Sequence, residues 1–590
     1  PGDAPGRGGQ LRRDGGNGRI RPLLTNHFFA PILEETPKNG GAQTMAEQTI
    51  QTRAFSSATL AQGLGQDYES WQVPRDRQWA TKSPTRAFIQ SPAGTGKLAF
   101  VRDVLLPYAG SMGRNILLLT DRTLGDGTRP GALRLQPPND SAGAVELPVE
   151  VLPAPSGGGR LMVLRYEALR DLLRTGLPYE LYSVQGTVFY VVLDQAHRLL
   201  EEAPFDPWTG EMTAFVCRLF PRSVQVYLSP AMEEAMAPIL AQVRRWDTQQ
   251  TQQRMVDEGM YRQDARFYRN QPVRSLPAPV FYRRLEEIAA AASAGDPEDK
   301  WLIFVSSKEA GRDLTRRINE ARRGAAVLLT AASRSGGAWQ RLEREGTFRE
   351  KVLVATRALV DRAELREPGL RHVVLSAGGR TELMSMLACC PAGQGELTVY
   401  VQLPDSQYAA RQIFQLQRKL EAIDEVARGG RDANRRLLQR YWLQGDLGVN
   451  RLFTIDGDFR LTPNPLAREK LAGELALYQA LRAHSGDPDY YPELVCGWLG
   501  LPRQIRRLGQ SGSFPTMEAL LAGYAGRPIP PEEQEAFYEA FLLCYQRCGG
   551  KPLRRAAGRH KATVNQGLAA LNAPYRLGKR AGAWVLERET

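Results

Sequence analysis

The chain of 590 residues is poor in cysteine and has no long apolar run. Six cysteines, at positions 217, 389, 390, 496, 544 and 548, are too sparse for a disulfide scaffold, so we expect reducing surroundings. No stretch approaches the roughly 18 uninterrupted apolar residues of a membrane-spanning helix. The first fifty residues also lack the apolar core of a secretory signal peptide. We therefore expect a cytoplasmic protein without a membrane partner.

Acidic residues are outnumbered by basic ones, 64 against 77, which gives a formal net charge of +13. Such an excess favours a polyanionic partner, because Lys and Arg release counterions when they bind a phosphate backbone. The alternative is that the excess only aids solubility.

Two sets of apolar runs alternate with amphipathic stretches along most of the chain. They predict an α/β protein with two tandem, doubly wound parallel sheets. Residues 1–45 are rich in Gly, Arg and Pro and are expected to be disordered. Residues 246–280 lack strand character and predict an inter-lobe connection or insertion. The first set, in a lobe at 46–245, is RAFIQ, NILLLT, LMVLRY, VFYVVLD and VQVYLS, and the second, at 281–405, is WLIFVSS, AAVLLT, KVLVAT, HVVLS and ELTVYVQ.

The strand signal fades after about residue 405, where Leu, Ala and Arg recur at helical spacing. Residues 406–550 are therefore predicted to form a mostly helical C-terminal domain. The last forty residues carry nine Lys or Arg against two acidic residues and end in YRLGKRAGAWVLER, which reads as two strands around a turn. This pattern predicts a basic, winged-helix-like end at 551–590. Trp584 could stack on a base, but a place in the hairpin core is the preferred interpretation.

A glycine-rich segment, SPAGTGKL at 91–98, lies between an apolar strand and a helical stretch. Glycines let the backbone close around a phosphate, and a lysine at this place can reach the phosphate oxygens. The next residue is normally Ser or Thr, whose hydroxyl binds magnesium, whereas Leu98 has no oxygen. We therefore expect ATP binding with a weakened Mg²⁺ site. The predicted nucleotide-binding residues are Ser91, Gly94, Thr95, Gly96, Lys97 and Leu98.

A second motif, DQAH, ends the apolar strand VFYVVLD. Asp194 at the strand end is the predicted metal ligand, since a carboxylate beside a phosphate loop can bind magnesium. Gln195 stands where a Glu would deprotonate the attacking water, and its amide cannot accept that proton. The predicted catalytic residues are Lys97, Asp194, Gln195 and His197. For His197 a structural or coupling role is preferred, with a role as substitute base as the alternative.

The order and spacing of these segments resemble a superfamily 2 helicase of the DEAD/DEAH-box type. Residues 115–127, 161–169, 224–234, 301–314 and 351–375 are similar to its motifs Ia, Ib, III, IV and V. The resemblance implies two RecA-like lobes, ATP with Mg²⁺ between them, and a DNA or RNA partner. The segments YESW, LLPYA, PFDPWTGEMTAFV and DFRLTPNPLAREKL are similar to a helicase family of Firmicutes and their mobile elements.

The chain departs from this family where catalysis takes place. Motif III reads Ser229-Pro230-Ala231 in place of Ser-Ala-Thr, and motif V has Ala363 in place of a glycine. Motif VI reads RTELMSMLACCPAG, so that no arginine remains where such helicases carry arginine fingers. The residues at these places are Ser385, Ala388, Cys389, Cys390 and Pro391.

These losses predict a nucleic-acid-binding pseudo-helicase with impaired or absent ATP hydrolysis. One alternative is an active motor that uses His197 as base or Arg357 and Arg380 as fingers. The other is a protein-interaction scaffold on a helicase fold. Basic residues at strand tips and in the last forty residues are the candidates for contact with nucleic-acid phosphates. They are Arg122, Arg357, Arg554, Arg555, Arg559, Lys561, Lys579 and Arg580.

Overall fold

The computed structural model of the protein describes most of the chain after residue 49. The chain divides into two units, Pro1–Gln48 and Thr49–Thr590, and every element below belongs to the second. The predicted disorder of residues 1–45 lies outside the described residues. Those are 50–74, 81–122, 124, 127–137, 143–184, 186–250, 260–271, 277–333, 335–360, 365–376, 378–390, 397–404, 406–429, 431–442, 447–456, 458–501, 503–508, 517–547, 553, 560–580 and 582–588.

Five buried parallel strands form the centre of the first lobe's sheet, where the apolar runs predicted them. Their side chains alternate between the two faces: Leu117 and Leu119 join one hydrophobic cluster, and Ile116 and Leu118 join the other. A strand buried on both faces reads as a continuous apolar run, which is why the sequence revealed these five. In sheet order they are β2 (Arg86–Gln90), β9 (Val224–Ser229), β8 (Val188–Leu193), β3 (Asn115–Leu119) and β6 (Arg160–Leu164).

The expectation that residues 246–280 lack strand character is wrong for β10 (Ala265–Asn270). This strand lies between β1 (Gln51–Phe55) and β2 and pairs with both in parallel. The sequence did not indicate this strand because several of its residues are polar. Asn270 is buried and donates from Nδ2 to the hydroxyl of Ser91 at 3.1 Å. A polar strand of the first lobe's sheet therefore supports the glycine-rich loop.

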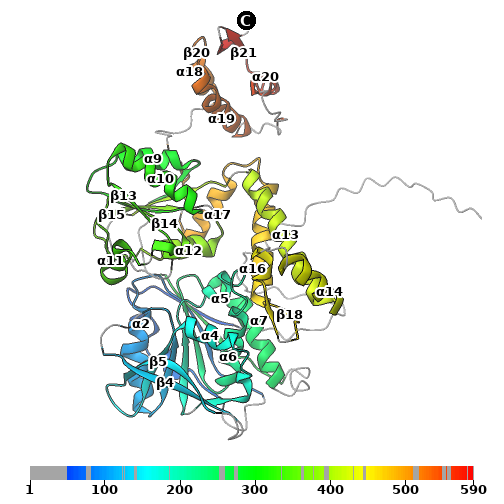
Figure 1. The fold of residues 1–590 in the computed structure, drawn as a ribbon. Coiled ribbons are helices and arrows are strands. Elements are labelled where there is room, and N and C mark those ends of the chain that lie inside the picture. The colour runs from blue at the N-terminus through cyan, green and yellow to red at the C-terminus, as the bar shows by residue number, and fades with distance from the viewer. Residues whose placement is uncertain are drawn as a thin grey trace, which may run out of the picture. The chain divides into compact units, whose positions relative to one another are not determined.

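An antiparallel extension, which the sequence did not predict, widens the same sheet beyond β6. It consists of β5 (Val145–Pro153), β4 (Arg129–Gln136) and the short β7 (Ser183–Val184). Figure 1 shows β4 and β5 as a long ribbon at the edge of the first lobe. Leu133 and Leu135 are buried, whereas Arg134 between them is exposed, so this ribbon has one apolar face.

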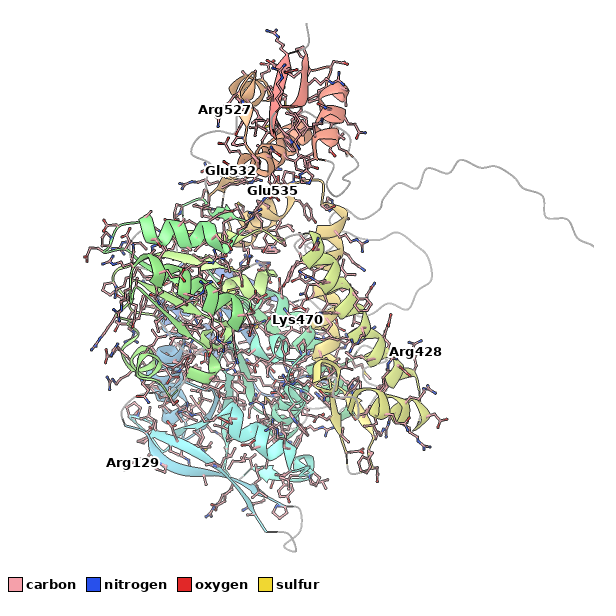
Figure 2. The ribbon with its side chains drawn as sticks, turned by 45° about the horizontal axis from the view of Figure 1, so that its top comes forward. Arg129, Arg428, Lys470, Arg527, Glu532 and Glu535 are labelled. Carbon is pink, nitrogen blue, oxygen red and sulfur yellow. The ribbon has the colours of Figure 1, made fainter. Side chains whose placement is uncertain are left out.

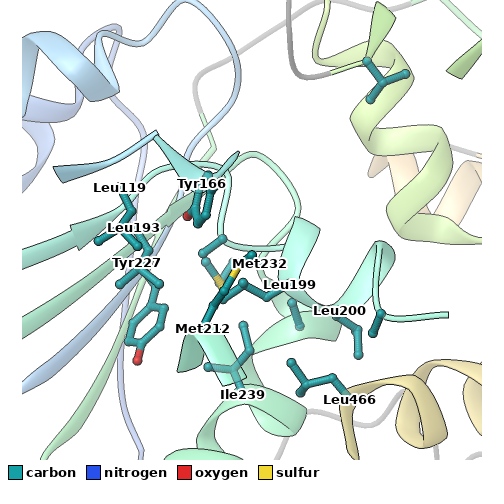
Figure 3. Packing of buried hydrophobic residues seen from close by; sticks show 14 of the residues in the cluster. Leu119, Tyr166, Leu193, Leu199, Leu200, Met212, Tyr227, Met232, Ile239 and Leu466 are labelled. Carbon is teal, nitrogen blue, oxygen red and sulfur yellow. The ribbon is translucent and has the colours of Figure 1, made fainter. Parts of the chain in front are cut away.

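Helices cover both faces of the first lobe's sheet. Figure 3 shows Leu119 and Leu193 from the strands packed near Met212 and Ile239 of two helices, with Leu466 from a later helix at the same cluster. The helices are α1 (Leu60–Leu64), α2 (Lys97–Phe100), which continues through a π-helical turn (Val101–Leu105) into α3 (Leu106–Ser111), then α4 (Tyr166–Arg174), α5 (Arg198–Glu201), α6 (Thr209–Leu219) and α7 (Glu233–Gln250).

The second lobe is built on a parallel sheet of seven strands. Its five apolar runs form strands as predicted, and two short strands join at one edge. In sheet order the strands are β13 (Ala326–Leu329), β14 (Val352–Ala355), β12 (Lys300–Phe304), β15 (Leu370–Leu375), β16 (Thr398–Gln402), β11 (Val280–Tyr282) and β19 (Arg506–Arg507). The helices of this lobe are α9 (Leu285–Ala294), α10 (Lys308–Ala321), α11 (Gly337–Glu345) and α12 (Arg380–Leu387).

The region after the second lobe is mostly helical, as predicted. Two long helices, α13 (Ser406–Arg428) and α16 (Pro465–Ala483), pack against each other (Figure 1). Asn464 caps the start of α16 by accepting from the Leu466 amide, and its Nδ2 donates to Thr209 in the first lobe at 2.7 Å. Smaller elements are α14 (Arg431–Leu437), a π-helical turn (Leu438–Trp442), α15 (Leu447–Asn450), the hairpin β17 (Phe453–Ile455) and β18 (Leu461–Pro463), and α17 (Tyr490–Leu499).

The chain ends in a winged-helix arrangement with its own hydrophobic cluster. Trp584 belongs to this cluster and is 9% exposed, so the prediction of a core position is confirmed. None of the helices among the described residues is long and apolar enough to cross a bilayer. In chain order the elements are α18 (Met517–Tyr524), β20 (Pro528–Ile529), α19 (Pro531–Arg547), α20 (His560–Ala570), β21 (Tyr575–Arg580) and β22 (Ala583–Arg588), with the strands in the order β20-β22-β21.

Taken together, these elements confirm the predicted fold class: two tandem, doubly wound RecA-like lobes, a mostly helical region and a winged-helix-like end.

Candidate nucleotide site

The loop after β2 has the conformation of a phosphate-binding loop. The strand ends at Gln90, and the helix that continues to Ser111 begins directly after Gly96. Gly94 and Gly96 have φ angles of 77° and 74°, in the left-handed region that side chains disfavour. The glycines at these two places are therefore required by the backbone, and the loop leads into a helix start, which is the arrangement that binds phosphate through backbone amides.

The ammonium group of Lys97 is buried within this loop. Its Nζ donates to the carbonyl oxygens of Ser91 and Pro92, both at 2.8 Å, and the residue is 5% exposed. The Thr95 hydroxyl donates to the Pro92 carbonyl at 2.7 Å and lies 2.7 Å from Ser91 Oγ. A lysine at this place in a glycine-rich loop can reach the oxygens of a bound phosphate.

Asp194 lies directly after β8 and is fully buried. Its Oδ2 accepts from the Thr120 hydroxyl at 2.9 Å and lies 3.8 Å from Nε of Arg122. Its backbone carbonyl accepts from the Tyr166 hydroxyl at 2.9 Å. The second carboxylate oxygen, Oδ1, is buried without a hydrogen-bond partner among the described residues. The residue is thus oriented by three side chains and keeps one carboxylate oxygen for a further ligand.

Gln195 has a left-handed backbone, with φ of 54°, and is 4% exposed. A side chain in this region costs on the order of 1–3 kcal/mol, and such strain is found mainly at functional sites. The strained turn directs the chain from β8 toward His197. Gln195, predicted to stand in place of a water-activating Glu, therefore lies in a strained turn and presents a neutral amide.

Leu98 is half-buried and packs against a hydrophobic cluster of the first lobe. It adds no oxygen to the single free oxygen of Asp194. Among the described residues no group of three or more His, Cys, Asp or Glu could hold a metal ion. Magnesium in phosphate sites is held by one or two carboxylates together with phosphate oxygens and waters, and here the described residues offer it Oδ1 of Asp194 but no hydroxyl at position 98.

A pocket lies between the two lobes beside the phosphate loop. The first lobe contributes basic and amide groups to it, whereas the described residues of the second lobe contribute a methyl and a thiol, from the chain directly after α12. The pocket is lined by Ala93, Lys97, Arg122, Gln195, Pro230, Ala388 and Cys389. Ala388 and Cys389, two of the positions predicted to stand in place of arginine fingers, therefore line the pocket and carry no charge.

Arg357 and Arg380, the candidate substitute fingers, form ion pairs away from this pocket. Arg357 binds Glu201, and Arg380 Nη2 lies 2.6 Å from Glu233 Oε2. Neither arginine lines the pocket. His197, the candidate substitute base, does not line it either: its Nδ1 lies 2.9 Å from Ser229 Oγ.

An ionic cluster around the buried Glu201 joins the two lobes to α16. Glu201, which is 4% exposed, binds Arg357 of the second lobe and Lys470 of α16. Burial alone would raise the pKa of Glu201, but the two cations outweigh it and hold the pKa below its ordinary value. Figure 2 labels Lys470 on α16. Sequence reasoning missed this cluster, and the only available signals were a Glu four residues after the DQAH histidine and the segment PNPLAREKL.

No family model matches the chain, and no curated protein matches it. Among solved structures the chain is similar to S. cerevisiae Dbp5 bound to RNA and ADP BeF3, with 13% identity, a TM-score of 0.32, and coverage of 62% of this chain and 81% of that chain. It is also similar to a fragment of a putative HsdR subunit of a type I restriction enzyme from Vibrio vulnificus YJ016, with 14% identity, a TM-score of 0.31, and coverage of 54% and 59%. A third is the E. coli DExH-box NTPase HrpB, with 12% identity, a TM-score of 0.30, and coverage of 82% and 56%. Likeness at this level assigns neither family nor activity.

The residues predicted to bind nucleic acid do not form one group. Arg122 lines the pocket, and Arg357 belongs to the ionic cluster. Lys561 is exposed on α20, and Lys579 and Arg580 are exposed at the end of β21. The predicted interactions of Arg554, Arg555 and Arg559 lie outside the described residues.

Proposed function

We propose that the protein is a superfamily 2 helicase-like, nucleic-acid-binding protein that binds ATP between its two lobes and hydrolyses it slowly or not at all. One observation carries this proposal. The pocket combines an intact phosphate loop on the first lobe with the uncharged Ala388 and Cys389 on the second.

ATP binding is supported by the geometry of the loop. Lys97 is buried beside it, and Gly94 and Gly96 have the backbone that close approach of a phosphate requires. Asp194 is held in place by the hydroxyls of Thr120 and Tyr166.

Weak hydrolysis is supported by the groups that are absent from the described part of the pocket. Gln195 can hold a water molecule but cannot take its proton, and general bases contribute about 10²–10⁴-fold to such rates. Loss of an arginine finger costs about 10³–10⁵ in turnover. The residues that could replace these groups are engaged elsewhere, since Arg357 and Arg380 pair with Glu201 and Glu233.

Nucleic-acid binding is supported by charge and by the fold of the C-terminal unit, by which we mean the winged-helix elements from α18 to β22. The net charge of +13 is partly concentrated in the last forty residues. A winged helix presents one helix and a hairpin on the same side, and here α20 carries Lys561 while the β21–β22 hairpin carries Lys579. Such an arrangement suits contact with a phosphate backbone.

The direct test measures binding of ATP and of nucleic acid by the full chain. We expect ATP to bind wild-type protein and not the Lys97→Ala variant, and both proteins to bind single-stranded and duplex DNA or RNA with an affinity that falls steeply with salt. Absence of ATP binding by the wild type would contradict the nucleotide part of the proposal. Absence of nucleic-acid binding at low salt would favour a protein scaffold instead.

A further inference from the structure

The pocket lacks the usual hydroxyl ligand of magnesium, so another positive group is needed beside the phosphates. In ordinary phosphate-loop proteins a divalent cation lies between the Ser or Thr after the loop lysine and the acidic residue at the neighbouring strand end. Here Leu98 packs into an apolar cluster instead. The charge of the β and γ phosphates must then be balanced by side chains.

Arg122 lies beside the acidic residue at this place. Its Nε lies 3.8 Å from Asp194 Oδ2, on the carboxylate that would otherwise bind magnesium. Arg122 lines the pocket together with Lys97 and Gln195, and 24% of its side chain is exposed. Two basic groups thus face the pocket from the first lobe.

One hydroxyl fixes both members of the Arg122–Asp194 pair. Thr120 Oγ1 donates to Asp194 Oδ2 at 2.9 Å and accepts from the backbone amide of Arg122 at 3.1 Å. The strand β3 ends just before this threonine, so the position of the arginine is set by the sheet itself. This hydroxyl therefore fixes the backbone at Arg122, and the guanidinium itself is oriented by the charge of Asp194.

A guanidinium is chemically suited to replace the ion. It is always charged, and its planar donors match two phosphate oxygens at once. A divalent cation on Asp194 would lie next to this guanidinium and be repelled by it. Among the described residues of the pocket, the oxygen open to a metal is Oδ1 of Asp194, so the ion's other positions would fall to water and phosphate oxygens.

We propose that Arg122 is a phosphate-binding residue that supplies the positive charge of the missing magnesium, so that the pocket binds nucleoside di- and triphosphates without a divalent cation. This inference rests on the proposed nucleotide binding and assigns Arg122 a role other than the nucleic-acid contact predicted from its place in the sequence.

The test is calorimetric titration of the full chain with ATP and with ADP, in excess magnesium chloride and in excess EDTA. We expect the dissociation constants in the two buffers to agree within about threefold, since the ion adds little. Arg122→Gln should weaken binding by about 10- to 100-fold in both buffers, as loss of a charge-assisted hydrogen bond does. Arg122→Lys keeps the charge but not the planar guanidinium, so its affinity for nucleotide should lie between those of the wild type and Arg122→Gln.

Arg102→Gln is the matched control, because Arg102 lies in the same lobe and its ion pair within the described part of the chain is with the exposed Asp103. It should bind both nucleotides as the wild type does. If Arg122→Gln has a lowered unfolding midpoint, its weaker binding could come from loss of stability. The Arg122→Lys variant and the comparison of the two buffers then test the inference. Binding that requires magnesium, or that is unchanged in both Arg122 variants, overturns this inference and leaves the proposed function standing. No binding by the wild type in either buffer refutes the proposed function itself.

Discussion

His197 of the first lobe and Ser385 of the second lobe are joined by a hydrogen bond, with Nε2 2.9 Å from Oγ. The other ring nitrogen, Nδ1, lies 2.9 Å from the hydroxyl of Ser229 in the first lobe. All three side chains are buried. A neutral imidazole offers one donor and one acceptor, and a hydroxyl can serve as either, so both bonds form without a net charge. The histidine of the DQAH motif therefore links the lobes directly.

This link predicts energetic coupling between His197 and Ser385. Either substitution to Ala leaves a buried polar group without its partner and should cost about 1–3 kcal/mol of the free energy of unfolding. In a double-mutant cycle measured by urea unfolding, the second substitution should cost less than the first, with a coupling of about 0.5–3 kcal/mol.

The control cycle pairs His197→Ala with Ser293→Ala. Ser293 lies on α9 of the second lobe and donates to the Ala289 carbonyl of its own helix, so these two changes should be additive. Additivity of the His197 and Ser385 substitutions would show that the two lobes are not coupled through this bond.

A second prediction concerns the buried Glu201. Glu201→Gln removes the charge that pairs with Arg357 and Lys470 and should cost about 3–5 kcal/mol of stability at neutral pH, as breaking a buried ion pair does. The neighbouring Glu202→Gln is the control, because Glu202 makes a half-exposed pair with Arg198 that is worth about 1 kcal/mol or less. Equal losses for the two variants would mean that the cluster does not hold the lobes and α16 together.

The same carboxylate predicts a pH dependence. The pKa of Glu201 lies below its ordinary value of 4.5, because Lys470 and Arg357 outweigh the effect of burial. A lowered folded pKa contributes stability that is present above pH 4.5 and is lost as the pH falls through the folded pKa. The stability difference between wild type and Glu201→Gln should therefore be constant above about pH 5.5, where a carboxyl of ordinary pKa is ionised, and shrink in more acidic solution. A difference that grew in acid would contradict this assignment.

Restoring two missing groups should raise ATP turnover. In Leu98→Thr with Gln195→Glu, a hydroxyl becomes available to magnesium and a carboxylate can accept the proton of the attacking water. We expect a magnesium-dependent rise of at least about tenfold over the wild type, limited by the missing arginine fingers and by repulsion between magnesium and Arg122. The control is Leu98→Val with Gln195→Asn, which keeps both positions inert. If the double variant is no faster than this control, the low ATP turnover has a cause other than Leu98 and Gln195.

The sequence predicted the elements whose signal is local. The ten apolar runs became strands because burial on both faces of a parallel sheet leaves no room for alternation. The strand β10 was missed because Arg266, Arg269 and Asn270 are satisfied by partners that the sequence does not reveal. The ribbon of β4 and β5 was missed because Pro130 and Gly131 argue against a strand in isolation.

Some residues of the candidate site could also be predicted from local sequence, and others could not. The glycine-rich loop and Asp194 could be placed from short motifs, since each follows a strand directly. The pairing of Arg122 with Asp194 and of Lys470 with Glu201 depends on which strands and helices become neighbours. Those pairs join residues far apart in the chain, and a local pattern contains no information about them.

The C-terminal unit should contribute to nucleic-acid affinity through charge. Lys561→Gln with Lys579→Gln should weaken binding to all sequences about equally and reduce the salt slope by about 2, because each lysine neutralises one phosphate. Arg580→Gln should have a smaller effect, because Arg580 pairs with Glu587 at 2.6 Å. Arg428→Gln, on α13 outside this unit, is the matched control (Figure 2). An equal loss of affinity for Arg428→Gln would point to a non-specific effect of net charge.

The most direct test of the proposed function is steady-state release of phosphate from ATP by the full chain, with saturating DNA and RNA, compared with Lys97→Ala. We expect ATP to bind the wild type while its turnover stays at the level of the Lys97→Ala variant, because Gln195 cannot take a proton and Ala388 and Cys389 carry no charge. A nucleic-acid-stimulated rate of about 1 s⁻¹ or more, as in ordinary enzymes, would contradict the proposal.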